Sequence, residues 1–170
     1  MHVQLIGWGT NGNPRLLGGK DSEGKGINEI LTDMGINSIT TYNWTGSGIY
    51  EDYIRWGEEA MSLQNKWDST LTIPYFPNVS IGWDNTPRYP KKGKESVVHF
   101  NNSPESFAAY LQKAKKYATD HPEQPKLIII NAWNEWVEGS YLEPDMLWGY
   151  GYLEAVKKVM SGAYNPYVKK

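Results

Sequence analysis

The sequence predicts an α/β fold in which parallel strands are covered by helices. Short β-rich runs alternate four times with amphipathic segments along the 170 residues, and this alternation is typical of βα units. The last of these runs is Leu-Ile-Ile-Ile at its centre, residues 127–130, as expected for a strand that is buried on both faces of a parallel sheet. The length predicts one domain, because domains average about 150 residues. That domain spans residues 1–170.

The first two units lie in the amino-terminal part of the chain. A strand is predicted over residues 3–8 and a helix over 26–34, which Gly35 ends. A second strand, 38–43, leads to a longer helix over 50–66. One face of that helix is apolar at spacings of three and four residues, and it carries Tyr53, Trp56, Ala60 and Leu63.

The last two units follow the same pattern. A strand over residues 70–76 opens a long polar loop. Ser103 is the predicted N-cap of the next helix, because a serine followed by a proline is typical of a helix start. A buried strand over 126–132 and a helix over 150–160 close the chain.

The composition excludes several classes of partner. Lys and Arg number 17 against 19 Asp and Glu, for a net charge of -2, and no basic run exceeds two residues, so no nucleic-acid partner is expected. No apolar stretch approaches the roughly 18 residues of a membrane span, and residues 1–4 do not resemble a signal peptide. We therefore expect a soluble chain and favour the cytoplasm. There is no cysteine, which excludes disulfides and thiol catalysis.

The aromatic content points to carbohydrate. The chain has 8 Trp and 12 Tyr, and such rings stack on sugar faces while their N–H and O–H groups bind sugar hydroxyls. In parallel sheets covered by helices, ligands bind beyond the carboxyl ends of the strands. The segments after the predicted strands hold the candidate substrate-binding residues Trp8, Tyr42, Trp44, Trp83, Asp84, Arg88, Trp133, Asn134, Trp136, Tyr141 and Glu143.

Two glutamates after the last strand are the candidate catalytic pair. Glu135 and Glu138 are three residues apart, so a helical turn would bring their Cβ atoms to within about 5–6 Å. A retaining glycosidase needs a close carboxylate pair. Trp133 and Trp136 beside them would supply apolar walls that raise a carboxyl pKa. The alternative is that both glutamates lie in a solvent-exposed loop and have no catalytic role. No Glu-x-x-His pattern is present, so neither a metal nor another cofactor is predicted.

Two ordered motifs resemble a known family. The run Asn-Glu-Trp-Val-Glu-Gly, 134–139, followed by Tyr-Leu-Glu-Pro-Asp, 141–145, closely resembles a motif of the WbsX-like proteins of polysaccharide gene clusters. These proteins are related to glycoside hydrolase family 99, the endo-α-mannosidases. The segment 74–88 resembles that family's second signature. The resemblance implies the carboxyl-terminal half, units five to eight, of a (β/α)8 TIM-type barrel.

The resemblance also implies roles for the pair. Glu135 would be the base that deprotonates the sugar 2-hydroxyl to give a 1,2-anhydro intermediate. Glu138 would be the acid that protonates the leaving oxygen and then activates water. Val137 replaces a polar residue such as His in the hydrolases, so the sugar is left open. Glu143 is expected to orient the loop, and an Asp84–Arg88 ion pair is as plausible as a substrate contact.

We therefore expect a glycoside hydrolase that acts on a polysaccharide or glycan. One alternative is a glycosyltransferase or other polysaccharide-biosynthesis protein, which should carry a nucleotide-sugar motif such as Asp-x-Asp, absent from the sequence. The other alternative is a non-catalytic carbohydrate-binding fragment. A closed barrel needs about 250 residues. The expected partners are therefore a carbohydrate and either the missing amino-terminal half or a second copy. The face turned toward that partner is predicted to carry Val3, Leu5, Ile39, Ile73 and Ile128 or Ile129.

Overall fold

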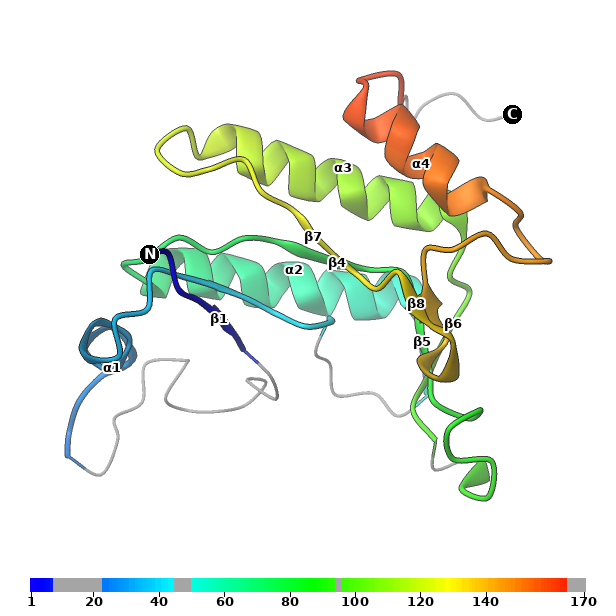
Figure 1. The fold of residues 1–170 in the computed structure, drawn as a ribbon, viewed down its shortest axis with the longest axis horizontal. Helices are drawn as coiled ribbons and strands as arrows, with labels where there is room; N and C mark the ends of the chain where they lie inside the picture. The colour runs from blue at the N-terminus through cyan, green and yellow to red at the C-terminus, as the bar shows by residue number, and fades with distance from the viewer. Residues whose placement is uncertain (8–22, 45–49, 94–95, 165–170) are drawn as a thin grey trace.

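The computed structural model describes residues 1–7, 23–44, 50–93 and 96–164, and the chain in these ranges alternates strands with helices (Figure 1). The helices are α1 (Ile27–Asp33), α2 (Tyr53–Thr70), α3 (Pro104–Asp120) and α4 (Gly151–Met160). The strands are β1 (Gln4–Ile6), β2 (Ser38–Thr40), β3 (Tyr50–Asp52), β4 (Asn78–Ser80), β5 (Trp83–Asp84), β6 (Val98–Phe100), β7 (Ile129–Asn131), β8 (Asn134–Glu135) and β9 (Ser140–Tyr141).

The strands β1, β2, β4 and β7 lie side by side in chain order and all run parallel. β1 pairs with β2, and β4 pairs with β7. The two pairs are joined through Ile39, which bridges Tyr75 just before β4. Its N–H donates to Pro74 O at 3.0 Å, and its carbonyl accepts from Phe76 N at 2.9 Å. Each of these strands is followed by a helix, as the alternation in the sequence predicts.

The third strand begins later in the sequence than predicted. It was expected over residues 70–76, but α2 continues to Thr70, and its end is marked by Leu71 N donating to Trp67 O at 2.8 Å. The strand β4 begins only at Asn78. Pro74 and Pro77 have no N–H to give to a neighbouring strand. The ladder therefore starts with one bridge at Tyr75 and becomes regular after the second proline.

The long polar loop that the sequence predicts contains a second small sheet. β3 pairs in parallel with β6, and β5 pairs antiparallel with β6. His99 of β6 stacks on Trp56 of α2 with ring centroids 3.8 Å apart and an interplanar angle of 1°. Because β3 takes up residues 50–52, α2 starts later than predicted, with Asp52 as its N-cap.

The apolar core forms two clusters on the helix side of the strands. One cluster joins α2, α3 and α4 and includes Tyr53, Trp56, Phe107, Tyr110 and Val159. The other joins α1, β2 and α2 and includes Ile27, Leu31, Ile39 and Trp67. Figure 1 shows α2, α3 and α4 along the strands.

The predicted partner-facing surface is wrong for most of its residues, although Ile129 lies on the same side of β7 as Asn131. Ile39 is fully buried in the α1–α2 cluster, with Val3, Leu5 and Ile73 packed against it. These residues therefore face the helices. Ile128 packs into the other cluster. Because strand side chains alternate between faces, the other side carries mainly polar residues: Gln4, Ser38, Thr40, Asn78, Ser80 and Asn131.

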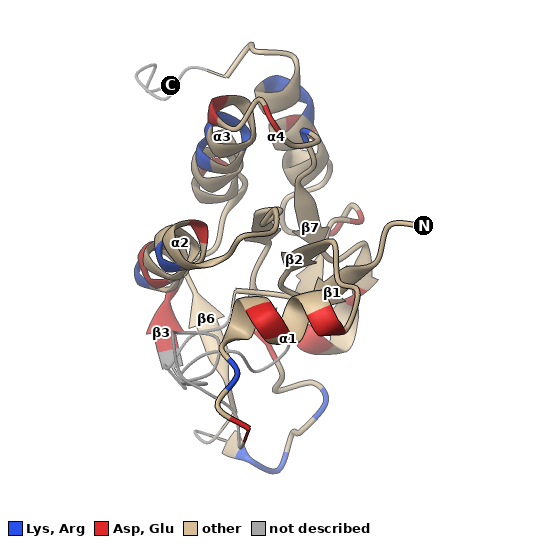
Figure 2. Cartoon of the chain, turned by 90° about the vertical axis from the view of Figure 1, so that its left-hand side faces the viewer, with Lys and Arg blue, Asp and Glu red and all other residues tan. Residues whose placement is uncertain are grey.

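The start of α3 confirms its predicted cap. Ser103 accepts from Ser106 N at 3.2 Å, and the Ser106 hydroxyl accepts from Ser103 N at 2.9 Å. Pro104 occupies the first turn. Figure 2 shows charges of both signs on α3 and α4, whereas α1 carries acidic residues. Among the described helices, none has the length and apolar character needed to cross a membrane.

Candidate active site

The segment after β7 folds into a tight turn that carries both candidate glutamates. β8 and β9 pair antiparallel, and a 3₁₀ turn over Trp136–Glu138 joins them. Gly139 ends this turn with φ 57°. A Cβ at Gly139 would lie 2.8 Å from Asp84 Cβ, so the backbone conformation and the close approach both require glycine. The helical turn that cooperation between Glu135 and Glu138 needs is therefore present.

Glu138 is buried and accepts hydrogen bonds on both carboxylate oxygens. Arg88 Nη1 donates to Oε1 at 2.6 Å, and the Tyr42 hydroxyl donates to Oε2 at 3.2 Å. Burial raises the pKa of Tyr42, and the neighbouring Glu138 and Glu135 charges raise it further. Tyr42 is therefore a neutral donor to Glu138 at physiological pH.

Glu135 shares the same arginine. Its side chain is 40 % exposed, and its Oε2 lies 3.8 Å from Arg88 Nη2. The 2.6 Å contact to Glu138 makes Arg88 a bridge between the two carboxylates. The structure thus brings together Tyr42, Arg88, Glu135 and Glu138, which the sequence placed after three different strands. Among the described residues, Arg88 makes these ion pairs rather than one with Asp84, whose Oδ1 accepts from Thr86 N at 2.8 Å.

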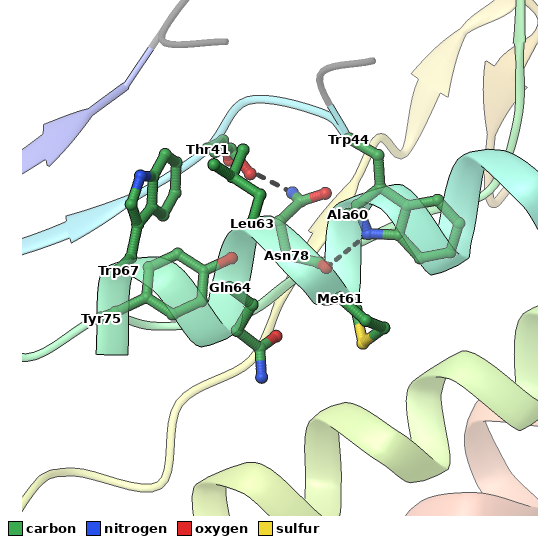
Figure 3. A pocket seen from close by; sticks show the side chains of 9 residues that line it. All are labelled: Thr41, Trp44, Ala60, Met61, Leu63, Gln64, Trp67, Tyr75 and Asn78. Carbon is green, nitrogen blue, oxygen red and sulfur yellow. Dashed lines mark hydrogen bonds between the residues drawn. The ribbon is translucent and has the colours of Figure 1, made fainter. Parts of the chain in front are cut away.

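Buried polar groups fix the backbone that carries Tyr42. Asn78 Nδ2 donates to Thr41 O at 3.2 Å and to Tyr42 O at 3.1 Å. Figure 3 shows Asn78 beside a cavity behind this segment, lined by Thr41, Trp44, Ala60, Met61, Leu63, Gln64, Trp67, Tyr75 and Asn78. The cavity lies between the strands and α2. Neither Glu135 nor Glu138 lines it.

Trp44 is a correction to the predicted site. A role in stacking on substrate was slightly favoured over core packing, but Trp44 is only 3 % exposed. Its Nε1 donates to Asn78 O at 2.7 Å, and its ring packs edge-on against Tyr110 at 4.8 Å. These contacts belong to the core, because an indole with a satisfied N–H and covered faces has no surface left for a sugar. Trp8, the candidate at the end of β1, lies outside the described residues.

The remaining aromatic candidates of this segment are Trp133, Trp136 and Tyr141, which lie within a few residues of the glutamates in the chain. Trp136 is 45 % exposed although it is held on two sides. Its ring stacks on Tyr141 at 3.9 Å, and its Nε1 donates to Glu143 Oε2 at 2.8 Å. Glu143 therefore helps to hold the Trp136 ring in place. Trp133 is exposed nearby.

Two further candidates flank this group. Trp83 is half-buried and meets Tyr42 edge-on at 6.3 Å. Asn134 is exposed on β8, directly before Glu135. Trp83 is therefore close in space to Tyr42, and Asn134 is next to Glu135 in the chain.

Two residues beside the site were missed by sequence reasoning. Asn131, the last residue of β7, is 3 % exposed, and Ser140 is fully buried. Ser140 Oγ donates to Asn131 Oδ1 at 2.6 Å. The position of Asn131 in the sequence could have pointed to it, because Asn131 begins the polar segment at the end of the most apolar strand. Groups of His, Asp or Glu arranged to hold a metal are absent from the described part of the chain.

Comparison with known proteins places the chain in a family. The model of the family described as "Glycosyltransferase WbsX" matches residues 20–156. The chain is 33 % identical over 113 residues to "Uncharacterized protein WxcX" of Xanthomonas campestris pv. campestris in each of two strains, ATCC 33913 and B100. That match covers 66 % of this chain but only 16 % of the relative. No solved structure gives a significant match. The chain belongs to the WbsX glycosyltransferase family.

Proposed function

We propose that the chain carries the catalytic pair of an enzyme that cleaves glycosidic bonds in a polysaccharide or glycan. One observation carries this proposal: Glu135 and Glu138 converge on one guanidinium, that of Arg88, beside Tyr42 and on a segment that also carries the exposed Trp133 and Trp136. A close carboxylate pair next to aromatic rings is what glycoside hydrolysis uses.

The proposed roles follow the resemblance. Glu135 removes the proton of the sugar 2-hydroxyl, and O2 attacks the anomeric carbon as the glycosidic bond breaks. Glu138 gives its proton to the leaving oxygen. Water then opens the 1,2-anhydro ring; Glu138 takes a proton from the water while Glu135 returns one to O2. Half-exposed Glu135 is accessible to a substrate, and buried Glu138 is held by Tyr42 and Arg88.

The bridge made by Arg88 must open for these roles. An acid carries a proton, and a protonated Glu138 cannot form the ion pair that Arg88 now makes at 2.6 Å. The Arg88 side chain is 41 % exposed and belongs to the connection between β5 and β6, so it has space to move. We propose that substrate entry draws Arg88 away from Glu138.

We also propose that the chain is the carboxyl-terminal half of a (β/α)8 barrel. The parallel, chain-order array β1-β2-β4-β7 and its intervening helices support this. Within the described residues, β1 pairs only with β2 and β7 pairs only with β4. Each therefore has an edge that a completing half could occupy, either an amino-terminal half or a second copy.

Glycosyl transfer is the second candidate, because the family is described as a glycosyltransferase. The same carboxylate pair could pass the sugar to a hydroxyl instead of to water. A nucleotide-sugar enzyme is less well supported, since the sequence has no Asp-x-Asp motif.

An isotope experiment separates these two reactions. The chain, alone and substituted for the matching segment of the Xanthomonas relative, is incubated with bacterial polysaccharides in H2(18)O. Hydrolysis predicts one 18O atom at each new reducing end. Glycosyl transfer predicts lengthened products without 18O. Release of nucleotide from nucleotide sugars, with no polysaccharide cleavage, would contradict the hydrolase proposal.

A further inference from the structure

Arg88 contacts the two glutamates unequally. Its Nη1 donates to Glu138 Oε1 at 2.6 Å, whereas its Nη2 lies 3.8 Å from Glu135 Oε2. The guanidinium therefore pairs mainly with Glu138, whose side chain is 6 % exposed. The side chain of Arg88 itself is 41 % exposed. A group that arrives from solvent can thus reach the positive partner of a buried carboxylate.

Departure of Arg88 would change the protonation of Glu138. The Tyr42 hydroxyl, which donates to Oε2 at 3.2 Å, is neutral. Two more carboxylates lie near, since Glu135 shares Arg88 and Asp84 of β5 packs against the end of the turn. None of these three neighbours carries positive charge. Because a buried carboxylate without a positive partner takes up a proton instead of staying charged, loss of Arg88 would give Glu138 the proton that a general acid needs.

An anion is the ligand that best replaces Glu138 at Arg88. A guanidinium binds a carboxylate through two parallel N–H···O bonds, whereas a neutral hydroxyl does not restore the lost charge pairing. The connection that carries Arg88 favours an anion too, because residues 85–93 also contain Lys91 and Lys92 and no acidic residue. Both lysines are exposed and, in the described structure, outside any ion pair. Lys92 Nζ lies 4.4 Å from the centre of the Tyr89 ring.

We propose that the substrate is an acidic glycan, and that the carboxylate of one of its uronic acids binds Arg88 and so releases Glu138 to take up a proton. The ion pair of Arg88 with Glu138 is exchanged for one with the sugar carboxylate. The proton that Glu138 gains comes from solvent and is the one later given to the leaving oxygen. The functional meaning rests on the proposed acid role of Glu138, whereas the exchange itself can be measured without catalysis.

The test measures binding and proton uptake by the 170-residue chain. The probes are oligosaccharides of glucuronate, galacturonate and mannuronate, each paired with its neutral, carboxyl-reduced form. Isothermal titration calorimetry at about pH 6, in two buffers with different heats of ionisation, gives the affinity and the number of protons taken up. We expect at least one uronate to bind about tenfold more tightly than its neutral form. Its binding should bring about one proton per ligand.

Three variants show where these effects arise. Glu138→Gln is already neutral, so it should bind the uronate with similar affinity and take up no proton. Arg88→Gln should remove the preference for the uronate over its neutral form. If Arg88→Gln does not fold because Glu138 is left unpaired, the double variant with Glu138→Gln lacks that buried charge and should lose the preference in the same way. Glu58→Gln, which alters the ion pair with Lys113, is the control and should change neither quantity.

Equal affinity for every uronate and its neutral form would overturn the proposal. A preference for a uronate without proton uptake would overturn it as well, because the exchange at Arg88 requires both. A chain that shows both effects and yet cleaves no glycan would refute only the proposed function. Cleavage of neutral glycans, with no preference for any uronate, would refute only the acidic substrate.

Discussion

The carboxylate of Glu138 is surrounded by donors from separate parts of the chain. Tyr42 follows β2, Arg88 comes from the connection between β5 and β6, and Glu138 itself ends the turn after β8. None of these contacts is local in sequence. The fold therefore determines the surroundings of Glu138, and single positions that hold the turn in place should be sensitive to substitution.

Among these positions, Gly139 is expected to be the most sensitive to substitution. Gly139→Ala places a side chain at φ 57° and brings its Cβ to 2.8 Å from Asp84 Cβ. Gly149→Ala is the matched control, since Gly149 has φ 55° with nothing within 4 Å of an added Cβ. The control should lose about 1 kcal/mol in free energy of unfolding, and Gly139→Ala should lose about 1–3 kcal/mol more. Urea denaturation measures both, and equal losses would show that the Asp84 contact can relax.

His99 makes stability depend on pH. Burial lowers its pKa from 6.5 to about 4, so between these values the unfolded chain binds a proton that the folded chain does not. Stability therefore falls as pH drops from about 6.5 to about 4, by up to about 3 kcal/mol. His99→Phe keeps a ring on Trp56 and removes the titration. Between pH 6.5 and about 4, the unfolding free energy of this variant should change less with pH than that of the original chain. Above pH 8 the two curves of unfolding free energy against pH should be parallel. Parallel curves at every pH would contradict the account.

At the scale of elements, the packing of α2 against α3 includes a close approach between Gly57 and Tyr110. A Cβ at Gly57 of α2 would overlap the Tyr110 ring of α3. Alanine normally stabilises a helix by about 1 kcal/mol over glycine. Here we expect Gly57→Ala to destabilise the chain by about 1–3 kcal/mol because of the overlap. The double variant with Tyr110→Leu should recover part of that loss. Thermal unfolding measures the cycle, and additive losses would contradict a Gly57–Tyr110 contact.

The helices were predictable because their signals are local. Gly35 and the Ser103–Pro104 pair predicted helix ends to within a few residues. The β3-β6-β5 sheet was missed because it joins residue 50 to residue 98 through mainly polar segments. The residues of the site were also predictable only in part. The motifs identified Glu135, Glu138 and Arg88, but residue type alone could not show that Trp44 faces the core or that Ser140 bonds Asn131.

At the scale of the whole molecule, the described array β1-β2-β4-β7 has parallel strands at both margins. Unpaired strand edges favour association with another chain. We therefore expect the isolated 170-residue chain to form dimers or larger species in sedimentation velocity, and a supplied amino-terminal half to suppress this. A stable monomer at high concentration would contradict the proposed half barrel.

The central claim is that Glu135 and Glu138 do chemistry together, and Glu-to-Gln exchange tests it most directly. In a barrel that contains these residues, Glu135→Gln and Glu138→Gln should each reduce glycan cleavage by about 10²–10⁴-fold, because glutamine keeps the shape but neither gives nor takes the proton. Glycan affinity should change little. Glu58→Gln, on the outer face of α2 beside Lys113, is the control and should cleave normally. Cleavage at the unmodified rate in both Gln variants would contradict the account.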